Sequence, residues 1–85
     1  MRIYYSSKFE REYAKLPKEI KVLAEEKETM FRKTPFAPKL NAHKLHGPFR
    51  KYWAFSIDEK YRIIFEFAKK DVAWFHSVGD HSIYR

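Results

Sequence analysis

The sequence predicts an α+β fold: a single β-α-α-β-β-β domain in which an antiparallel sheet carries a helical hairpin on one face. Two observations predict it. Helical periodicity follows a short strand-like segment in the first half of the chain, and alternating strand-like segments fill the second half. The 85 residues, 45% hydrophobic and 19% aromatic, suit one domain over residues 1–85 with a small, aromatic-rich core.

The first half predicts one strand and two helices. Residues 2–6 are β-branched and aromatic, which is typical of a strand. Ser7 and Glu10 then have the spacing of a capping box, in which each side chain satisfies a free amide at a helix start. Pro17 ends this helix and suits the first turn of a second one over 18–33, so the two helices should form an antiparallel hairpin.

The second half predicts a three-stranded meander. The segment 34–44 holds two prolines and lacks periodicity, so we expect a connecting loop. Hydrophobic and polar residues then alternate over 52–57, 61–67 and 72–78, with polar turns between these strands. Gly79 ends the last strand and leaves a short tail.

Two helices can cover only one side of such a sheet. Arg62, Ile64 and Glu66 lie opposite the apolar row of their strand, so we expect them on the open side. An arginine there has two interpretations. It forms an ordinary ion pair, with Glu66 as the nearest partner, or it contacts an anion bound on the open face.

The charge of the chain indicates an anionic partner. Lysine and arginine number 18 against 11 acidic residues, which gives a formal charge of +7. Nucleic acid, an acidic protein or a membrane surface would suit this excess, while the simpler alternative is that it only keeps the protein soluble. The basic residues are spread along the chain, so any basic patch must be assembled by folding. The absence of cysteine and of a long apolar run predicts a cytoplasmic protein without a membrane segment.

Several kinds of chemistry are excluded by the residue pattern. His43 and His46 are too few ligands for zinc, and no glycine-rich phosphate loop is present. The run 80–82 contains the residue types of a hydrolase triad, but adjacent side chains project in different directions. We therefore expect neither a metal nor a cofactor.

The remaining chemistry is that of RNA cleavage. Attack of the 2′-hydroxyl on the neighbouring phosphate needs a base, an acid for the leaving 5′-oxygen, and cations for the transition state. Imidazole can act as acid or base near neutral pH, and arginine matches phosphoryl oxygens with two hydrogen bonds. These residue types occur at His43, Arg50, Lys51, Lys60, Arg62, His81 and Tyr84.

Four segments, in this order along the chain, resemble the RelE/ParE superfamily of toxins. They are His-Lys-Leu-His-Gly at 43–47, Tyr-Trp-Ala-Phe-Ser-Ile at 52–57, Tyr-Arg-Ile-Ile-Phe at 61–65, and the ending Gly-Asp-His-Ser-Ile-Tyr-Arg at 79–85. The similarity is greatest to the YafQ-like and RelE-like ribonucleases. It implies endonucleolytic cleavage of mRNA on the ribosome, which inhibits translation, and restraint by a cognate acidic antitoxin.

The resemblance also implies roles for single residues. His43 falls on a catalytic histidine, His81 on a C-terminal histidine that acts as general acid or base, Arg62 on an arginine that contacts the scissile phosphate, and Tyr84 on a catalytic or base-stacking aromatic residue. The expected RNA-binding residues are Lys39, Lys44, Arg50, Lys51, Lys60 and Arg85. Lys69 and Lys70 add positive charge suited to ribosomal RNA.

The sequence also departs from this pattern. Ser56 stands where a relative has a further histidine, and Lys60 lies where an acidic residue is expected. No family motif includes His46 or His76, which we therefore interpret as structural. The assignment of acid and base stays open.

Two other functions fit the same fold, because fold does not determine function. One is a ParE-like toxin that inhibits DNA gyrase without nuclease chemistry, and the other is an inactive interaction module. Convergence of His43, Arg62, His81 and Tyr84 in one cleft would favour the nuclease.

Overall fold

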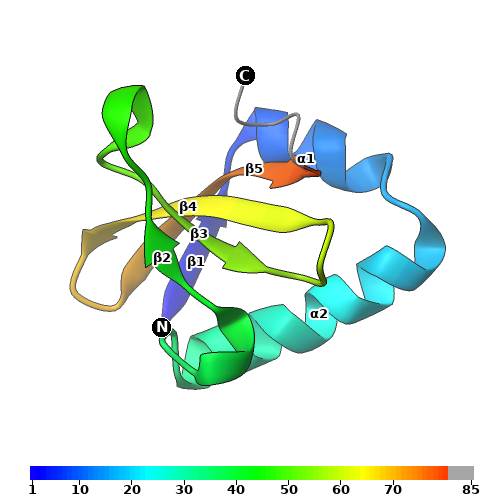
Figure 1. The fold of residues 1–85 in the computed structure, drawn as a ribbon, viewed down its shortest axis with the longest axis horizontal. Coiled ribbons are helices and arrows are strands. Elements are labelled where there is room, and N and C mark those ends of the chain that lie inside the picture. Colours follow the sequence, from blue (N-terminus) through cyan, green and yellow to red (C-terminus); the bar gives the residue numbers. More distant parts are fainter. Residues whose placement is uncertain (81–85) are drawn as a thin grey trace.

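A five-stranded sheet in the order β1-β5-β4-β3-β2 organises the protein (Figure 1). Apolar side chains of both helices and of the sheet share one core. The computed structural model describes residues 1–80. The elements are β1 (Arg2–Tyr5), α1 (Ser7–Ala14), α2 (Lys18–Lys33), β2 (His43–Lys44), β3 (Trp53–Ser56), β4 (Arg62–Lys69) and β5 (Val72–Gly79), with 3-10 turns η1 (Pro38–Leu40) and η2 (Gly47–Phe49). The α+β class and the predicted helices and strands are confirmed.

The sheet is mixed, so the expectation of a wholly antiparallel sheet is wrong. β1 pairs with β5 in parallel, with Arg2 opposite Val72 and Tyr5 opposite Phe75. The other neighbouring strands pair antiparallel. The parallel pair is possible because the two helices and three strands between β1 and β5 provide a long crossover connection.

The predicted loop 34–44 contains a strand at its end, which is a second correction. His43 pairs with Ala54 and Lys44 with Trp53, which makes β2 an edge strand. A strand of two residues is too short to show alternation, so nothing in its sequence distinguished it from a loop.

The cap of α1 is Ser6 and not Ser7 as the capping-box pattern predicts. The Ser6 hydroxyl accepts a hydrogen bond from the Phe9 amide at 2.9 Å and donates one to the carbonyl of His76, also at 2.9 Å. Ser7 is already the first residue of the helix. The same side chain thus caps α1 and ties it to β5, a tertiary contact that a local pattern does not contain.

Replacing Ser6 by alanine is expected to lower the free energy of unfolding by about 1 kcal/mol, because both hydrogen bonds are lost. In a domain of this size the melting temperature should fall by roughly 4–8 °C. Ser7→Ala is the matched control and should leave thermal unfolding, followed by circular dichroism, almost unchanged. Equal losses of stability from both variants would contradict the assignment of the cap to Ser6 and favour Ser7.

Helix α1 completes the edge of β5 beyond the point where β1 ends. The Glu12 carboxylate accepts hydrogen bonds from the Val78 amide at 3.1 Å and the Ser77 hydroxyl at 2.8 Å. Lys8 donates to the same carboxylate at 2.7 Å and to Ser77. Beyond Phe75, where β1 no longer pairs with β5, the Glu12 side chain therefore binds the free edge of β5.

The carboxyl of Glu12 is held in its charged form. Burial alone would raise its pKa, but the hydrogen bonds from Lys8, Ser77 and Val78 together bring the pKa below its ordinary value. A carboxyl whose pKa is lower in the folded state stabilises the fold above its unfolded pKa, and this contribution is lost as the pH falls through the folded value.

Acid should therefore weaken the α1–β5 contact. We expect the free energy of unfolding of the parent to decrease as the pH falls below the ordinary glutamate value of 4.5. The variant Glu12→Gln should be less stable at neutral pH and should show a weaker dependence over this acid range. Urea unfolding at a series of pH values measures both slopes, and parallel slopes would contradict the role of Glu12.

The core is built around one phenylalanine of α2. The Phe31 ring is fully buried and lies 5.0 Å from the ring of Phe55, 4.8 Å from Phe65 and 5.4 Å from Phe75. These three residues come from β3, β4 and β5, so a single side chain joins α2 to the three central strands. Phe31 thus determines which face of the sheet packs against α2. The polar groups of the strands lie on the opposite face.

None of the helices within residues 1–80 is long and apolar enough to cross a membrane.

Candidate functional site

The face of the sheet opposite the helices carries the candidate site. Residues paired across neighbouring strands share a face, so the register places His43, Ala54, Ile64 and Ser77 in one row. Ala54 and Ile64 are 0% and 4% exposed, so they form a buried, apolar floor. Polar side chains surround this floor, which is how a surface for a charged ligand is usually built.

Arg62 begins β4 and lies on the same face, one row along the strands from Ile64. Its guanidinium donates hydrogen bonds to the carbonyls of Asp58 at 2.8 Å and Glu59 at 3.2 Å, in the turn between β3 and β4. The suggested ion pair with Glu66 is absent from the described part of the chain, since Glu66 binds His76 instead. Arg62 is half-buried and keeps donors beyond those used in the turn.

His43 lies on the exposed edge strand β2, at the opposite side of the floor. Its Nδ1 lies 3.1 Å from the carbonyl of Asn41. A carbonyl only accepts, so Nδ1 carries the proton and Nε2 is left as an acceptor. Ordinary strand spacings place His43 and Arg62 roughly 12 Å apart between Cα atoms. They share a surface, and both side chains would have to extend over the floor to reach one phosphate.

An imidazole–carboxylate pair spans β4 and β5, on the side of the floor away from β2, and the sequence interpretation missed it. His76 Nε2 donates to Glu66 Oε1 at 2.8 Å, and the Tyr52 ring meets the imidazole edge-on at 5.0 Å. A carboxylate that orients an imidazole is an arrangement used for proton transfer. The sequence treats His76 as structural, whereas its ring belongs to the open face.

His76 lies on that face at a β-bulge of β5. Ile64 pairs with Ser77 and Phe65 pairs with Phe75, so His76 is the extra residue of β5. Strict alternation along β5 does not allow for such an insertion. A signal was nevertheless available, since Trp74 and His76 alternate with the buried Ala73 and Phe75.

The aromatic residues of the open face form a continuous ladder. The Tyr4 and Trp74 rings stack with centroids 5.0 Å apart, and the Trp74 and His76 rings are nearly parallel at 6.4 Å. Tyr4 and Trp74 keep 39% and 36% of their surfaces exposed. Exposed aromatic side chains on a sheet are the platform on which unpaired nucleobases stack.

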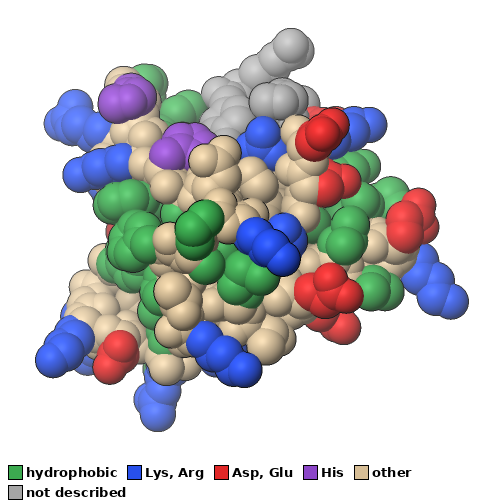
Figure 2. All heavy atoms as spheres, turned by 60° about the horizontal axis from the view of Figure 1, so that its bottom comes forward, with side chains coloured by type: hydrophobic (Ala, Val, Ile, Leu, Met, Phe, Trp, Pro, Cys, Tyr) green, Lys and Arg blue, Asp and Glu red, His purple; other side chains and the backbone are tan. Residues whose placement is uncertain are grey.

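Within residues 1–80 the predicted RNA-binding residues lie in three places, and most of them are in or after β2. Figure 2 shows histidine and basic side chains gathered on the left, over the segment between β2 and β3. The exposed members of this segment are His43, Lys44, His46, Arg50 and Lys51. Lys44 shares a row with Trp53 and so points away from the open face.

Two other predicted residues lie elsewhere. Lys60 is in the turn between β3 and β4, with its ammonium over the Tyr61 ring at 5.6 Å. Lys39 is part of η1, which packs beside α2, so the structure does not bring it to the open face.

His81, Tyr84 and Arg85 lie outside the described residues. What the structure places is the end of the strand before them: Gly79 pairs with Arg62. Within residues 1–80 no group of three histidine or acidic side chains is arranged to hold a metal ion.

Comparison with solved structures identifies the fold. YafQ from E. coli strain BL21(DE3) aligns with a TM-score of 0.82 at 16% identity, covering 99% of this chain and 98% of that one. A YoeB/ParE toxin from Agrobacterium tumefaciens aligns with a TM-score of 0.79 at 15% identity, covering 95% and 99%. This chain has the RelE/YafQ toxin fold.

The similarity extends to a toxin solved with its antitoxin. The RelB–RelE antitoxin–toxin complex from Methanococcus jannaschii matches with a TM-score of 0.75 at 20% identity, covering 95% of this chain and 94% of that chain. No protein-family profile and no curated protein matches the sequence itself. The resemblance seen in the four segments is therefore supported by the RelE/YafQ arrangement of the whole backbone.

Proposed function

We propose that the protein is the toxin of a type II toxin–antitoxin system and cleaves mRNA as a ribosome-dependent endoribonuclease. The observation that carries this proposal is the register of the sheet. It gathers His43, Arg62 and the Glu66–His76 pair on the face of the sheet opposite Phe31 of α2, and Arg62 pairs with Gly79, the end of the strand that precedes His81. The RelE/YafQ toxin fold and the charge of +7 support it independently.

In the proposed reaction the 2′-hydroxyl attacks the adjacent phosphorus and the bond to the 5′-oxygen breaks. The products are a 2′,3′-cyclic phosphate and a 5′-hydroxyl. His43 Nε2 is free to take the proton of the attacking hydroxyl, and His81 supplies one to the leaving oxygen. Arg62 stabilises the phosphorane through donors that the turn does not use. Tyr84 stacks on a base beside the cleaved bond.

The partners follow from the same proposal. The RelB–RelE neighbour is an antitoxin–toxin complex, and a chain of charge +7 suits an acidic antitoxin segment. Lys44, Arg50, Lys51 and Lys60 supply phosphate contacts that orient the protein on ribosomal RNA without reading sequence. We place its action in the cytoplasm, where ribosomes and mRNA are found.

A translation assay tests the function directly. Purified protein is added to a reporter mRNA, either translated in a cell-free reaction or alone, and new 5′ ends are mapped by sequencing. We expect strong cleavage of the translated mRNA and little of the naked RNA, because a domain this small has few groups with which to position RNA. Equal cleavage of the translated and the naked mRNA would mean that the reaction does not depend on the ribosome.

A gyrase supercoiling assay run beside it tests the ParE-like alternative. We expect supercoiling to continue at toxin concentrations that cleave mRNA. Inhibition of supercoiling without RNA cleavage would assign the protein to the gyrase inhibitors. The absence of both effects would identify an inactive module.

A further inference from the structure

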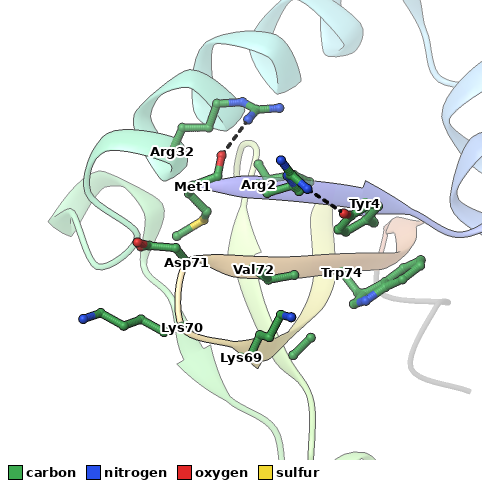
Figure 3. Close-up of a pocket in the computed structure, with 11 residues that line it drawn as sticks. Met1, Arg2, Tyr4, Arg32, Lys69, Lys70, Asp71, Val72 and Trp74 are labelled. Carbon is green, nitrogen blue, oxygen red and sulfur yellow. Dashed lines mark hydrogen bonds between the residues drawn. The ribbon is translucent and has the colours of Figure 1, made fainter.

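A hollow at the other end of the open face is unused by the proposed cleavage chemistry. It has a volume of about 870 Å³ and lies where β1, β5 and the β4–β5 turn meet. Its size is within the range of pockets that hold small molecules. In Figure 3 the side chains of Arg2, Tyr4, Val72 and Trp74 stand together on the near side of the β1–β5 pair.

The register explains why these groups come together. Arg2 pairs with Val72 and Tyr4 with Trp74, so two rows of the parallel pair contribute to one face. Lys69 pairs with Val72 from the β4 side. Cationic groups therefore stand on both sides of an apolar floor, and Trp74 forms a wall at its end.

The charge of the hollow is positive. Within residues 1–80, Arg2, Lys69 and Lys70 form no ion pair with a carboxylate, while Asp71 lines the rim. Arg32 also lines the hollow, but it is paired with Glu28 at 3.2 Å and donates to the Met1 carbonyl. The free cations thus outnumber the single lining carboxylate.

A cationic rim beside an exposed aromatic wall matches a nucleotide. The base can lie against the indole, and the phosphate can lie between the guanidinium and the ammonium. An acidic peptide would use the cations but would leave the apolar and aromatic surface without a partner. Glu66, which pairs with Trp74 from β4, accepts a hydrogen bond from His76 and is not among the residues that line the hollow.

The hollow is continuous with the proposed cleavage face. The ladder runs from Tyr4 through Trp74 to His76, and β5 continues from there to Gly79 beside Arg62. A single RNA strand that follows β5 would pass both regions. The distance along the strand from Val72 to Gly79 is on the order of 20 Å, which requires several nucleotides of extended RNA.

We propose that this hollow binds one nucleotide of the single-stranded RNA substrate, at a position away from the cleaved bond. The base stacks on Trp74, and Arg2 and Lys69 contact its phosphate. This inference rests on the proposed function for the identity of the substrate, but binding can be measured without cleavage.

The test uses the His81→Ala protein, so that RNA stays intact, and a fluorescein-labelled single-stranded RNA 12-mer at low salt. Trp74→Ala should weaken binding about 5- to 150-fold, which corresponds to the loss of one stacked base. Trp74→Phe should restore most of the affinity. Lys69→Ala should reduce the salt dependence by about 0.7 in the logarithmic slope, as expected for one phosphate contact to a single strand.

Lys18→Ala is the matched control, because it removes one exposed charge from the start of α2 on the helical side. It should leave both the affinity and the salt slope nearly unchanged. Circular dichroism melts check that every variant is folded, and Trp74 is exposed enough for its replacement to be tolerated.

Tryptophan emission distinguishes a base from any other anion. With Trp53→Phe in the same background, Trp74 is the only tryptophan, and stacking of a base should quench its emission. Poly-glutamate is the comparison ligand and should bind weakly without quenching. Equal binding of both ligands without quenching would assign the hollow to an acidic protein segment and overturn the proposal.

The outcomes separate the two proposals. If the parent cleaves translated mRNA but Trp74→Ala binds the RNA as tightly as its background, the subsite is wrong and the proposed function stands. If Trp74→Ala loses binding while the parent shows no cleavage in the translation assay, the subsite stands and the nuclease is wrong. Absence of RNA binding by the background protein would overturn the subsite.

Discussion

Replacing His81 by alanine is expected to lower the rate of mRNA cleavage by about 10²–10⁴, the usual contribution of a general acid or base. We expect the protein to stay folded, because the core described within residues 1–80, from Ile3 to Val78, is built by the helices and strands that precede this residue. The measurement is the rate of appearance of new 5′ ends in a translation reaction, with growth arrest of cells that express the variant as a second readout. A folded His81→Ala protein of full activity would exclude His81 from proton transfer.

Replacing Arg62 by alanine is expected to lower both the rate of cleavage and the stability of the protein, unlike His81→Ala. Its guanidinium binds the carbonyls of Asp58 and Glu59, so Arg62→Ala should cost about 1 kcal/mol of stability in addition to its loss of rate. Arg62→Lys keeps a positive charge but loses the paired donors, and it should remain slow. If activity fell only in proportion to the folded fraction, Arg62 would be a positioning residue of the turn and not a contact of the phosphate.

Truncation of Phe31 is expected to have the largest effect on stability. The ring is fully buried and contacts those of Phe55, Phe65 and Phe75, so Phe31→Ala leaves a cavity where α2 meets the three central strands. Such changes cost about 3–5 kcal/mol, a large part of the 5–15 kcal/mol that stabilises an ordinary domain. Urea unfolding at neutral pH measures the loss.

Phe36→Ala is the control for this substitution. Phe36 is 57% exposed and touches the Trp53 and Phe67 rings at 5.4 and 5.9 Å, so its removal should cost about 1 kcal/mol or less. Phe31→Leu keeps part of the volume and should lie between the two. Similar losses from Phe31→Ala and Phe36→Ala would mean that the core does not depend on Phe31.

The periodicity of the sequence was enough for the helices and for the strands β3, β4 and β5, because each has one face in contact with the core. Periodicity did not show which strand pairs with β1 or in which direction. A strand of four residues carries no information on which other strand it pairs with, or in which direction. β2 and the cap at Ser6 were missed for a related reason, since both depend on partners distant in sequence.

The candidate site was predictable only in part. The alternation along β4 correctly placed Arg62 on the open face, because strand geometry determines it. The Glu66–His76 pair depends on a one-residue bulge in β5, and the aromatic ladder depends on the parallel register of β1. The alternation along β5 could have placed Trp74 and His76 on this face, but their contacts with Tyr4 and Glu66 depend on tertiary structure and could not be predicted from the chain alone.

The parallel pairing of β1 with β5 also determines when the binding face comes into existence. Arg2 meets Val72, so the two partners are separated by 70 residues of chain (72 − 2). Closing so long a loop is slow, and here it must also wait until β5 has been synthesised. A nascent chain can form α1 and α2 early, but it has neither the Tyr4–Trp74 stack nor the hollow beside it. The surface proposed to bind RNA therefore cannot form until β5 has been made and has paired with β1, so a nascent chain that ends before Val72 has both helices but no binding face.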